Sequence, residues 1–245
     1  MRSHVFPVRW AEVRADGVRL CGFAVVAVII GLIAGCQSSY YSSNQVLVRV
    51  IDASFKANGV DVYFVKEPIA YNVGSSSFTN YVQVSPGVQT VTVYQSGTQK
   101  AGAQLNSNFT SGEQYSVLLT DQGDGYQAAI LPDKGVPPPV GQVSLRFLDE
   151  ASNIGTVDIY AVPDGTKLEA AAPLMTGVTA GTTGNYLELP AGKYNVTVTA
   201  AGEIVPMYTS SLLAFTDGQV RTLVLVNQPM MSKPTLSMQI GNDLN

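Results

Sequence analysis

Residues 45–54 read QVLVRVIDAS, and residues 142–152 read QVSLRFLDEAS. In both stretches apolar side chains recur at every second position, and Arg49 and Arg146 occupy equivalent places between them. Successive side chains of a strand point to opposite faces of a sheet, so this alternation predicts strands with one face in a core. The other face, with Arg49 and Arg146, is expected to point outward to solvent.

Three further segments recur in the same order. VDVY at 60–63 matches VDIY at 157–160, YVQVSPGVQTVTV at 81–93 matches YLELPAGKYNVTV at 186–198, and GEQYSVLL at 112–119 matches GQVRTLVL at 218–225. Four motifs in one order indicate a duplicated unit. The motifs are rich in Val and Thr and are separated by turn-forming residues, so we predict an all-β fold of two tandem β-sandwich domains.

These repeats divide the chain into five segments. We expect an export signal at 1–35, a tether at 36–44, a first sandwich at 45–134, a proline-rich linker at 135–141 and a second sandwich at 142–245. The linker contains three consecutive prolines, and such runs favour an extended, semi-rigid conformation. It is therefore predicted to hold the two sandwiches apart.

The segment Leu20–Gly35 contains sixteen residues without a charge and is followed by Cys36. A membrane-spanning helix needs about 20 apolar residues, so the segment is short for an anchor and suits a signal peptide. The string LIAGC at 32–36 resembles the lipobox of bacterial lipoproteins, which implies cleavage before Cys36 and attachment of lipid to its thiol. Gln37, where an Asp would imply inner-membrane retention, favours the outer membrane. The alternative is a short transmembrane helix with an incidental cysteine.

The two sets of motifs resemble the DUF4397 family of exported bacterial proteins, in tandem copies. The resemblance implies β-sandwich modules on secreted or lipid-anchored chains, with no established activity and no functional residues to carry over. Segments such as the one at 190–198 also resemble those of prealbumin-like and immunoglobulin-like modules, so either kind of sandwich is expected.

The composition excludes most catalytic chemistry. His4, Trp10 and Cys21 lie in the predicted signal and Cys36 is assigned to lipid, so the mature chain has no His and no free thiol. Catalytic triads and the usual zinc sites need those residues, and we expect no enzyme activity, cofactor or metal. Residues 36–245 carry 10 basic and 16 acidic side chains, which disfavours nucleic-acid binding. Asp121 and Asp124 flank a Gly-containing stretch that predicts a plain hairpin turn, with a calcium site as the alternative.

The duplicated charges and tyrosines are the candidate surface residues. Arg49 with Asp61, and Arg146 with Asp158, would form a cross-strand ion pair in each sandwich if their strands are neighbours, with Asp52 or Asp149 nearby. Such a pair either fixes strand register or forms part of a ligand-binding face. Tyr63 and Tyr160 alternate out of phase with the core residues, so they are expected to face solvent, where aromatic rings can contact sugars or proteins.

The predicted function is that of a lipid-anchored cell-envelope module that binds or supports other molecules without catalysis. Its partners are the membrane, through Cys36, and an envelope protein or polysaccharide. Association with a protein is the first hypothesis and binding of a carbohydrate or cell-wall polymer is the alternative. A glycoside hydrolase built from carboxylates is the third, with candidates Asp121, Asp124, Asp149, Glu150 and Asp158. Clustered exposed tyrosines beside a groove would favour sugar binding, an exposed sheet edge would favour protein association, and two carboxylates about 5 to 9 Å apart in a cleft would favour hydrolysis.

Overall fold

The computed structural model describes residues 44–57, 59–228 and 236–244, and these residues belong to one compact unit. The predicted signal, Cys36 and nearly all of the tether lie outside the described residues. Within those residues the structure consists of strands and one short 3₁₀ turn, η1 (Leu168–Ala170). The prediction of an all-β sandwich fold is confirmed. No helix among the described residues is both long and apolar enough to cross a membrane.

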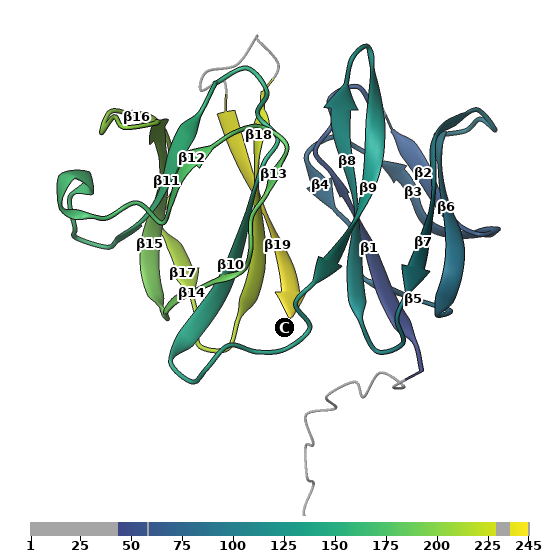
Figure 1. Cartoon of the computed structure of the whole chain (residues 1–245), viewed down its shortest axis with the longest axis horizontal. Coiled ribbons are helices and arrows are strands. Elements are labelled where there is room, and N and C mark those ends of the chain that lie inside the picture. The colour runs from purple at the N-terminus through teal and green to yellow at the C-terminus, as the bar shows by residue number, and fades with distance from the viewer. Residues whose placement is uncertain (1–43, 58, 229–235, 245) are drawn as a thin grey trace, which may run out of the picture. The chain divides into compact units, whose positions relative to one another are not determined.

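The first half of the chain folds into a sandwich of two sheets (Figure 1). One sheet has the order β4-β1-β8-β9, with β5 also paired to β1, and the other has the order β3-β2-β6-β7. The strands are β1 (Val46–Asp52), β2 (Val60–Phe64), β3 (Glu67–Val73), β4 (Ser77–Phe78), β5 (Val82–Val84), β6 (Gly87–Gln95), β7 (Ala101–Phe109), β8 (Gln114–Gln122) and β9 (Gly125–Asp133).

The second half repeats this arrangement. One sheet has the order β13-β10-β18-β19, with β14 also paired to β10, and the other has the order β12-β11-β15-β16, with β17 also paired to β15. The strands are β10 (Gln142–Asp149), β11 (Val157–Pro163), β12 (Met175–Val178), β13 (Thr182–Thr183), β14 (Leu187–Pro190), β15 (Gly192–Ala200), β16 (Pro206–Thr209), β17 (Leu213–Phe215), β18 (Val220–Asn227) and β19 (Leu236–Leu244).

Each half contains one parallel strand pair at the same place. β1 pairs in parallel with β8, and β10 pairs in parallel with β18. A parallel pair needs a long crossover connection, and the strands of the second sheet supply it in both halves. The registers also correspond, because Arg49 lies opposite Ser116 and Arg146 lies opposite Thr222.

The predicted alternation places the core correctly. Val46, Val48 and Val50 of β1 lie in the core of the first sandwich, and Val143, Leu145 and Phe147 of β10 lie in the core of the second. Burying such side chains contributes roughly 25 cal/mol per Å² of apolar surface, which makes these two cores the main source of stability.

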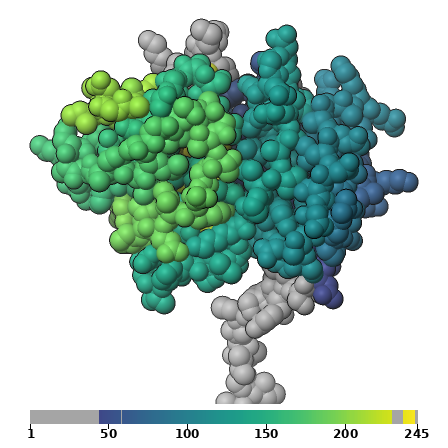
Figure 2. Space-filling model, in the orientation of Figure 1, coloured from purple at the N-terminus to yellow at the C-terminus, as the bar shows by residue number. Residues whose placement is uncertain are grey.

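The opposite face of these strands is not open to solvent, because the two sandwiches pack against each other. A third apolar cluster joins Ile51 and Leu118 of the first sandwich to Leu148, Val224 and Val226 of the second. In Figure 2 the atoms of the two halves meet without a gap. The expectation that the proline-rich linker holds the sandwiches apart is therefore wrong: both parallel-strand sheets carry apolar residues on both faces, and burial of the outer ones favours direct contact.

Candidate functional site

Arg49 and Arg146 lie at the contact between the two sandwiches. They are only 1% and 2% exposed, which corrects the expectation that they face solvent. Each arginine reaches an aspartate of the other sandwich: Arg49 Nη2 donates to Asp243 Oδ1 at 2.6 Å, and Arg146 Nη2 donates to Asp133 Oδ1 at 2.5 Å. Residues at equivalent positions thus form two reciprocal ion pairs.

Hydroxyl groups complete this charge cluster. Asp133 Oδ2 accepts from the hydroxyls of Ser116 and Tyr81, both at 2.6 Å. Asp243 Oδ2 accepts from the hydroxyls of Thr222 and Tyr186, both at 2.5 Å. The guanidinium carbons of the two arginines lie 4.8 Å and 4.7 Å from the ring centres of Tyr81 and Tyr186. All these groups are held by one another, so the cluster serves to join the sandwiches.

The electrostatics of Arg49 agree with that role. Burial by itself lowers the pKa of a guanidinium, but the neighbouring carboxylates of Asp243 and Asp133 more than offset it, and the pKa of Arg49 is raised. The charged form is therefore kept in a site that excludes water.

Asp61 and Asp158 do not pair with the arginines. The proposed cross-strand pairs fail because β1 and β2, like β10 and β11, belong to different sheets. Asp61 Oδ1 instead accepts the backbone N–H of Asn72 at 2.8 Å and the hydroxyl of Ser96 at 2.9 Å. Asp158 accepts the backbone N–H groups of Gly177 and Gly202, each at 2.8 Å. Each aspartate thus holds one residue of an adjacent strand and one residue of a turn, and the N–H of Asn72 is the main cause of the lowered pKa of Asp61.

Asp52 and Asp149 also have a local role. Asp52 Oδ1 accepts the backbone N–H of Ser54 at 2.9 Å, and Asp149 Oδ1 accepts that of Ala151 at 3.0 Å. Within the described residues, the second carboxyl oxygen of each is buried without a hydrogen-bond partner. Burial raises the pKa of Asp52 to about 7 and that of Asp149 to about 6.

The two equivalent tyrosines differ. Tyr63 is half-buried, but Tyr160 is only 6% exposed, so its expected exposure is wrong. The second sandwich has residues 164–174 between β11 and β12, whereas only residues 65–66 separate β2 from β3. Leu174 at the end of this longer connection donates its N–H to the carbonyl of Ile159 at 2.7 Å, so additional chain lies beside Tyr160.

Tyr63 belongs to a group of three aromatic side chains, Tyr63, Tyr71 and Tyr94, which we call the tyrosine cluster. The Tyr63 ring centre lies 6.2 Å from that of Tyr71 and 5.4 Å from that of Tyr94, both nearly edge-on. Tyr71 is 64% exposed. The pKa of Tyr63 is raised, chiefly by its interaction with the Tyr71 side chain.

A groove of about 400 Å³ lies beside the tyrosine cluster. It is lined by Tyr63, Val65, Lys66, Tyr94, Thr98 and Gln99. Polar pairs lie on the neighbouring strands β6 and β7: Thr90 donates to Asn106 Oδ1 at 2.6 Å, and Gln104 Nε2 donates to the hydroxyl of Thr92 at 3.3 Å. Aromatic rings, a cation and groups that both donate and accept hydrogen bonds are therefore present together on the β2–β6–β7 sheet.

The second sandwich exposes apolar side chains. They lie in and around β16, which is an edge strand of its sheet. The exposed residues are Ile204, Val205, Met207 and Leu212. We call them the β16 apolar edge.

Asp121 and Asp124 lie at a hairpin between β8 and β9, as the plain-turn hypothesis predicts. Asp121 Oδ1 accepts the hydroxyl of Ser54 at 2.5 Å and the N–H of Lys56 at 3.1 Å. Among the described residues no three His, Cys, Asp or Glu side chains gather as a metal site would require. Asp121 and Glu150 line one groove of about 310 Å³, and burial, with the charge of Asp149, raises the pKa of Glu150 to about 7.

Sequence reasoning missed the partners that matter. Asp133 and Asp243 end the strands that follow GEQYSVLL and GQVRTLVL, and their equivalence could have been found by extending the repeat to the C-terminal strands. Tyr94 follows the TVTV motif directly, but nothing in the linear pattern brings it next to Tyr63. That contact depends on the pairing of β2 with β6.

Comparison with family models gives a match. Residues 46–160 match the model described as "Domain of unknown function (DUF4397)", a range that covers the first sandwich and continues into β11. Comparison with curated proteins gives no match.

Several solved structures are similar at low identity. The multi-modular glycogen-degrading pneumococcal virulence factor SpuA is 11% identical with a TM-score of 0.27, over 75% of this chain and 21% of that chain. This chain thus spans about a fifth of that protein. The family CBM26 module of Eubacterium rectale Amy13K, in complex with maltoheptaose, is 8% identical with a TM-score of 0.26, over 79% and 95% of the two chains. A structure of α-glucan binding by a streptococcal virulence factor is 10% identical with a TM-score of 0.24, over 73% of this chain and 91% of that chain. At these TM-scores no property is transferred to this chain.

Proposed function

We propose that the protein is a lipid-anchored module of the cell envelope that binds a polysaccharide through the tyrosine cluster and has no catalytic activity. The observation that supports this most is the packing of Tyr63, Tyr71 and Tyr94 beside a groove. Geometry thus favours the carbohydrate alternative over protein association as the main activity.

The chemistry of the groove suits a sugar chain. A sugar ring has apolar C–H faces and a rim of hydroxyls, so it needs aromatic contact area together with groups that donate and accept hydrogen bonds. Tyr94, which lines the groove, and the exposed Tyr71 of the same cluster offer the first at a low entropic cost, since two torsions fix each ring. Gln99 and Thr98 offer the second, and Lys66 adds a donor at the edge.

The anchor is proposed from the signal. Its uncharged segment at 20–35 ends at Cys36, and the Gln at position 37 favours the outer membrane. Several acyl chains on one residue would hold the domain firmly, since each buried CH₂ contributes about 0.8 kcal/mol. Cys36→Ala is expected to move the protein from the membrane fraction to the soluble fraction, and retention of this variant in membranes would contradict the anchor.

We also propose that residues 142–245 are a second copy of the DUF4397 unit. Four motifs in the same order and the same order of strands in both sheets support the duplication. The proposed domains keep the boundaries 45–134 and 142–245, with the linker at 135–141.

Affinity electrophoresis tests the polysaccharide proposal. The full chain is run through gels that contain polysaccharide isolated from the envelope, and its migration is compared with that of Tyr71→Ala and Tyr94→Ala. Removal of an aromatic contact residue costs about 1 to 2 kcal/mol, so each variant should bind about tenfold more weakly. Val140→Ala, which truncates an exposed side chain of the linker, is the control and should migrate like the original chain. Unretarded migration of the original chain would refute the proposal.

A second candidate function, association with a protein, is favoured by the β16 apolar edge. An edge strand presents unpaired backbone groups, and exposed apolar side chains beside it add contact area. A photoreactive residue at position 205 is expected to give a discrete crosslinked product in intact cells, while one at position 140 should give none. Identical crosslinking patterns from both positions would contradict a docking role for this edge.

A further inference from the structure

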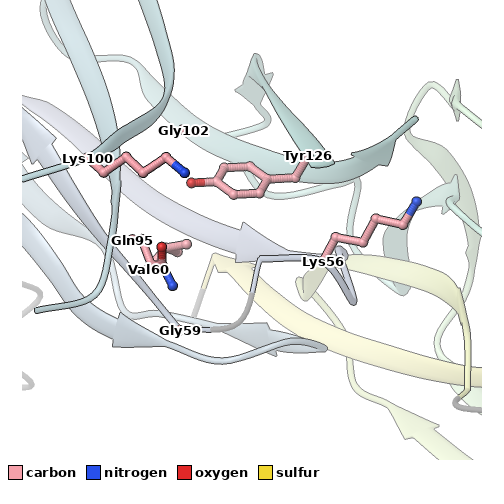
Figure 3. Close-up of a pocket in the computed structure, with 7 residues that line it drawn as sticks. All are labelled: Lys56, Gly59, Val60, Gln95, Lys100, Gly102 and Tyr126. Atoms are coloured by element: carbon pink, nitrogen blue, oxygen red, sulfur yellow. The ribbon is translucent and has the colours of Figure 1, made fainter. Parts of the chain in front are cut away.

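A second hollow of the first sandwich lies at the open end between its two sheets. It measures about 180 Å³ and is lined by Lys56, Gly59, Val60, Gln95, Lys100, Gly102 and Tyr126. These residues come from four places in the chain: the start of β2 and the residues before it, the end of β6, the start of β7 and the start of β9. Figure 3 shows the Lys100 and Tyr126 side chains pointing toward each other across the pocket.

The hydroxyl of Tyr126 is a buried group without a hydrogen-bond partner in the described part of the chain. It rests against Gly102, where an added Cβ would collide with the hydroxyl oxygen. A buried polar group without a partner costs about 1 to 3 kcal/mol, so its presence here calls for a group that accepts a hydrogen bond from the hydroxyl.

The lining is basic. It includes two lysines and no carboxylate, and the Lys56 ammonium is hydrogen-bonded to a neutral acceptor, the carbonyl of Gly123. Burial raises the pKa of Tyr126, and the charge of Asp52 contributes to this shift. Burial raises the pKa of Asp52 itself to about 7, which diminishes its negative charge near neutral pH. Asp121 Oδ1 already accepts hydrogen bonds from the Ser54 hydroxyl and from the backbone N–H of Lys56.

We propose that this pocket binds one compact oxyanionic group, a carboxylate or a phosphate, with Lys100 and Tyr126 as its donors. Hydrogen bonds from an ammonium and a hydroxyl to an anion are about twice as strong as neutral ones, and the pocket offers both donors side by side. At about 180 Å³ the pocket has room for one such group together with water molecules. The inference is independent of the tyrosine cluster and of its polysaccharide.

The second sandwich lacks the same donor. Tyr126 lies opposite Asp121 in the β8–β9 pair, and Leu236 lies opposite Asn227 at the equivalent point of the β18–β19 pair. Leu236 is buried in the apolar core there. The oxyanion site is therefore a property of the first sandwich alone.

Two-dimensional NMR of the full chain in detergent micelles tests the site. The protein is titrated with inorganic phosphate in one arm and with glucuronate in the other, at constant ionic strength maintained with chloride. We expect saturable shifts of the backbone signals around residues 100 and 126 in at least one arm, and the stronger arm identifies the kind of oxyanion.

Lys100→Met and Tyr126→Phe each remove one donor and keep most of the side-chain volume. Affinity should fall about tenfold or more in each, as expected for a charge-assisted hydrogen bond. Lys167→Met, which removes an exposed lysine of the second sandwich, should leave affinity unchanged. The proposal is overturned if neither anion gives saturable shifts, or if Lys167→Met weakens binding as much as Lys100→Met does.

Discussion

The two sandwiches share their sheet order and their buried charges but differ in their surfaces. Arg49 and Arg146 lie at equivalent positions and make equivalent contacts. Tyr63 is half-buried in a cluster of tyrosines, whereas Tyr160 is buried, and Tyr126 corresponds to Leu236. The shared residues hold the chain together and the differing residues make up the candidate binding sites, which places both proposed ligands on the first sandwich.

Removing Asp133 should have the largest effect on the shared part. Asp133 Oδ1 accepts from Arg146, and Asp133 Oδ2 lies 3.6 Å from Arg49 Nε, so Asp133→Ala leaves buried guanidinium charge without compensation. We expect a loss of about 3 to 5 kcal/mol in the free energy of unfolding, measured by urea denaturation. The double variant Arg49→Met with Asp243→Leu removes both members of one ion pair, so it should lower the free energy of unfolding by less than Asp133→Ala does. A loss below about 1 kcal/mol for Asp133→Ala would show that the cluster does not hold the sandwiches together.

Exchanging the residues that differ should separate binding from stability. Tyr126→Leu copies the second sandwich into the first, and it removes a buried hydroxyl that has no partner among the described residues. We expect the free energy of unfolding to change by less than about 1.5 kcal/mol, because removal of the unpaired hydroxyl offsets the packing that the smaller side chain loses. Anion binding should be lost in the same variant, as followed by the NMR titration. Undiminished binding would mean that Tyr126 is not a donor.

The pH dependence of stability should distinguish the buried carboxyl groups of Asp52 and Asp149. Burial raises the folded pKa of Asp52 to about 7 and of Asp149 to about 6, against about 3.9 in an unfolded chain. The folded state then binds more protons than the unfolded state, so this contribution is complete below about pH 4 and is lost as the pH rises to each folded pKa. Compared with the original chain, Asp52→Asn should flatten the fall in melting temperature up to about pH 7, and Asp149→Asn the fall up to about pH 6. Unchanged profiles in both variants would contradict the raised values.

Asp61 should show the opposite dependence and the smallest effect. Its pKa is lowered, mainly by the N–H of Asn72, so its contribution to stability is present above the unfolded pKa and is lost as the pH falls through the folded pKa. Asp61→Asn should cost about 1 kcal/mol near neutral pH, the usual value of one such hydrogen bond. Chemical denaturation at pH 7 and at pH 3 should show a larger cost at pH 7 than at pH 3. Equal costs at both values would mean that the carboxylate charge is irrelevant there.

The sequence predicted the core better than the surface. Alternation along Val46, Val48 and Val50 correctly separates the core face of β1 from its other face, because side-chain direction in a strand is a local property. What covers that other face depends on the contact between the sandwiches. The alternation carries no information about this contact, so it wrongly predicts that Arg49 faces solvent. The tyrosine cluster could be predicted only in part: Tyr63 was identified, but its contact with Tyr94 depends on the pairing of β2 with β6.

Hydrogen exchange of the full chain, measured by mass spectrometry with and without envelope polysaccharide, tests whether the first sandwich carries the polysaccharide site. We expect slower exchange in residues 60–73 and 90–99, which carry the tyrosine cluster and its groove, and unchanged exchange in residues 157–178 of the second sandwich, the equivalents of 60–73. Protection confined to the second sandwich, or no protection in either, would contradict the assignment of binding to the first.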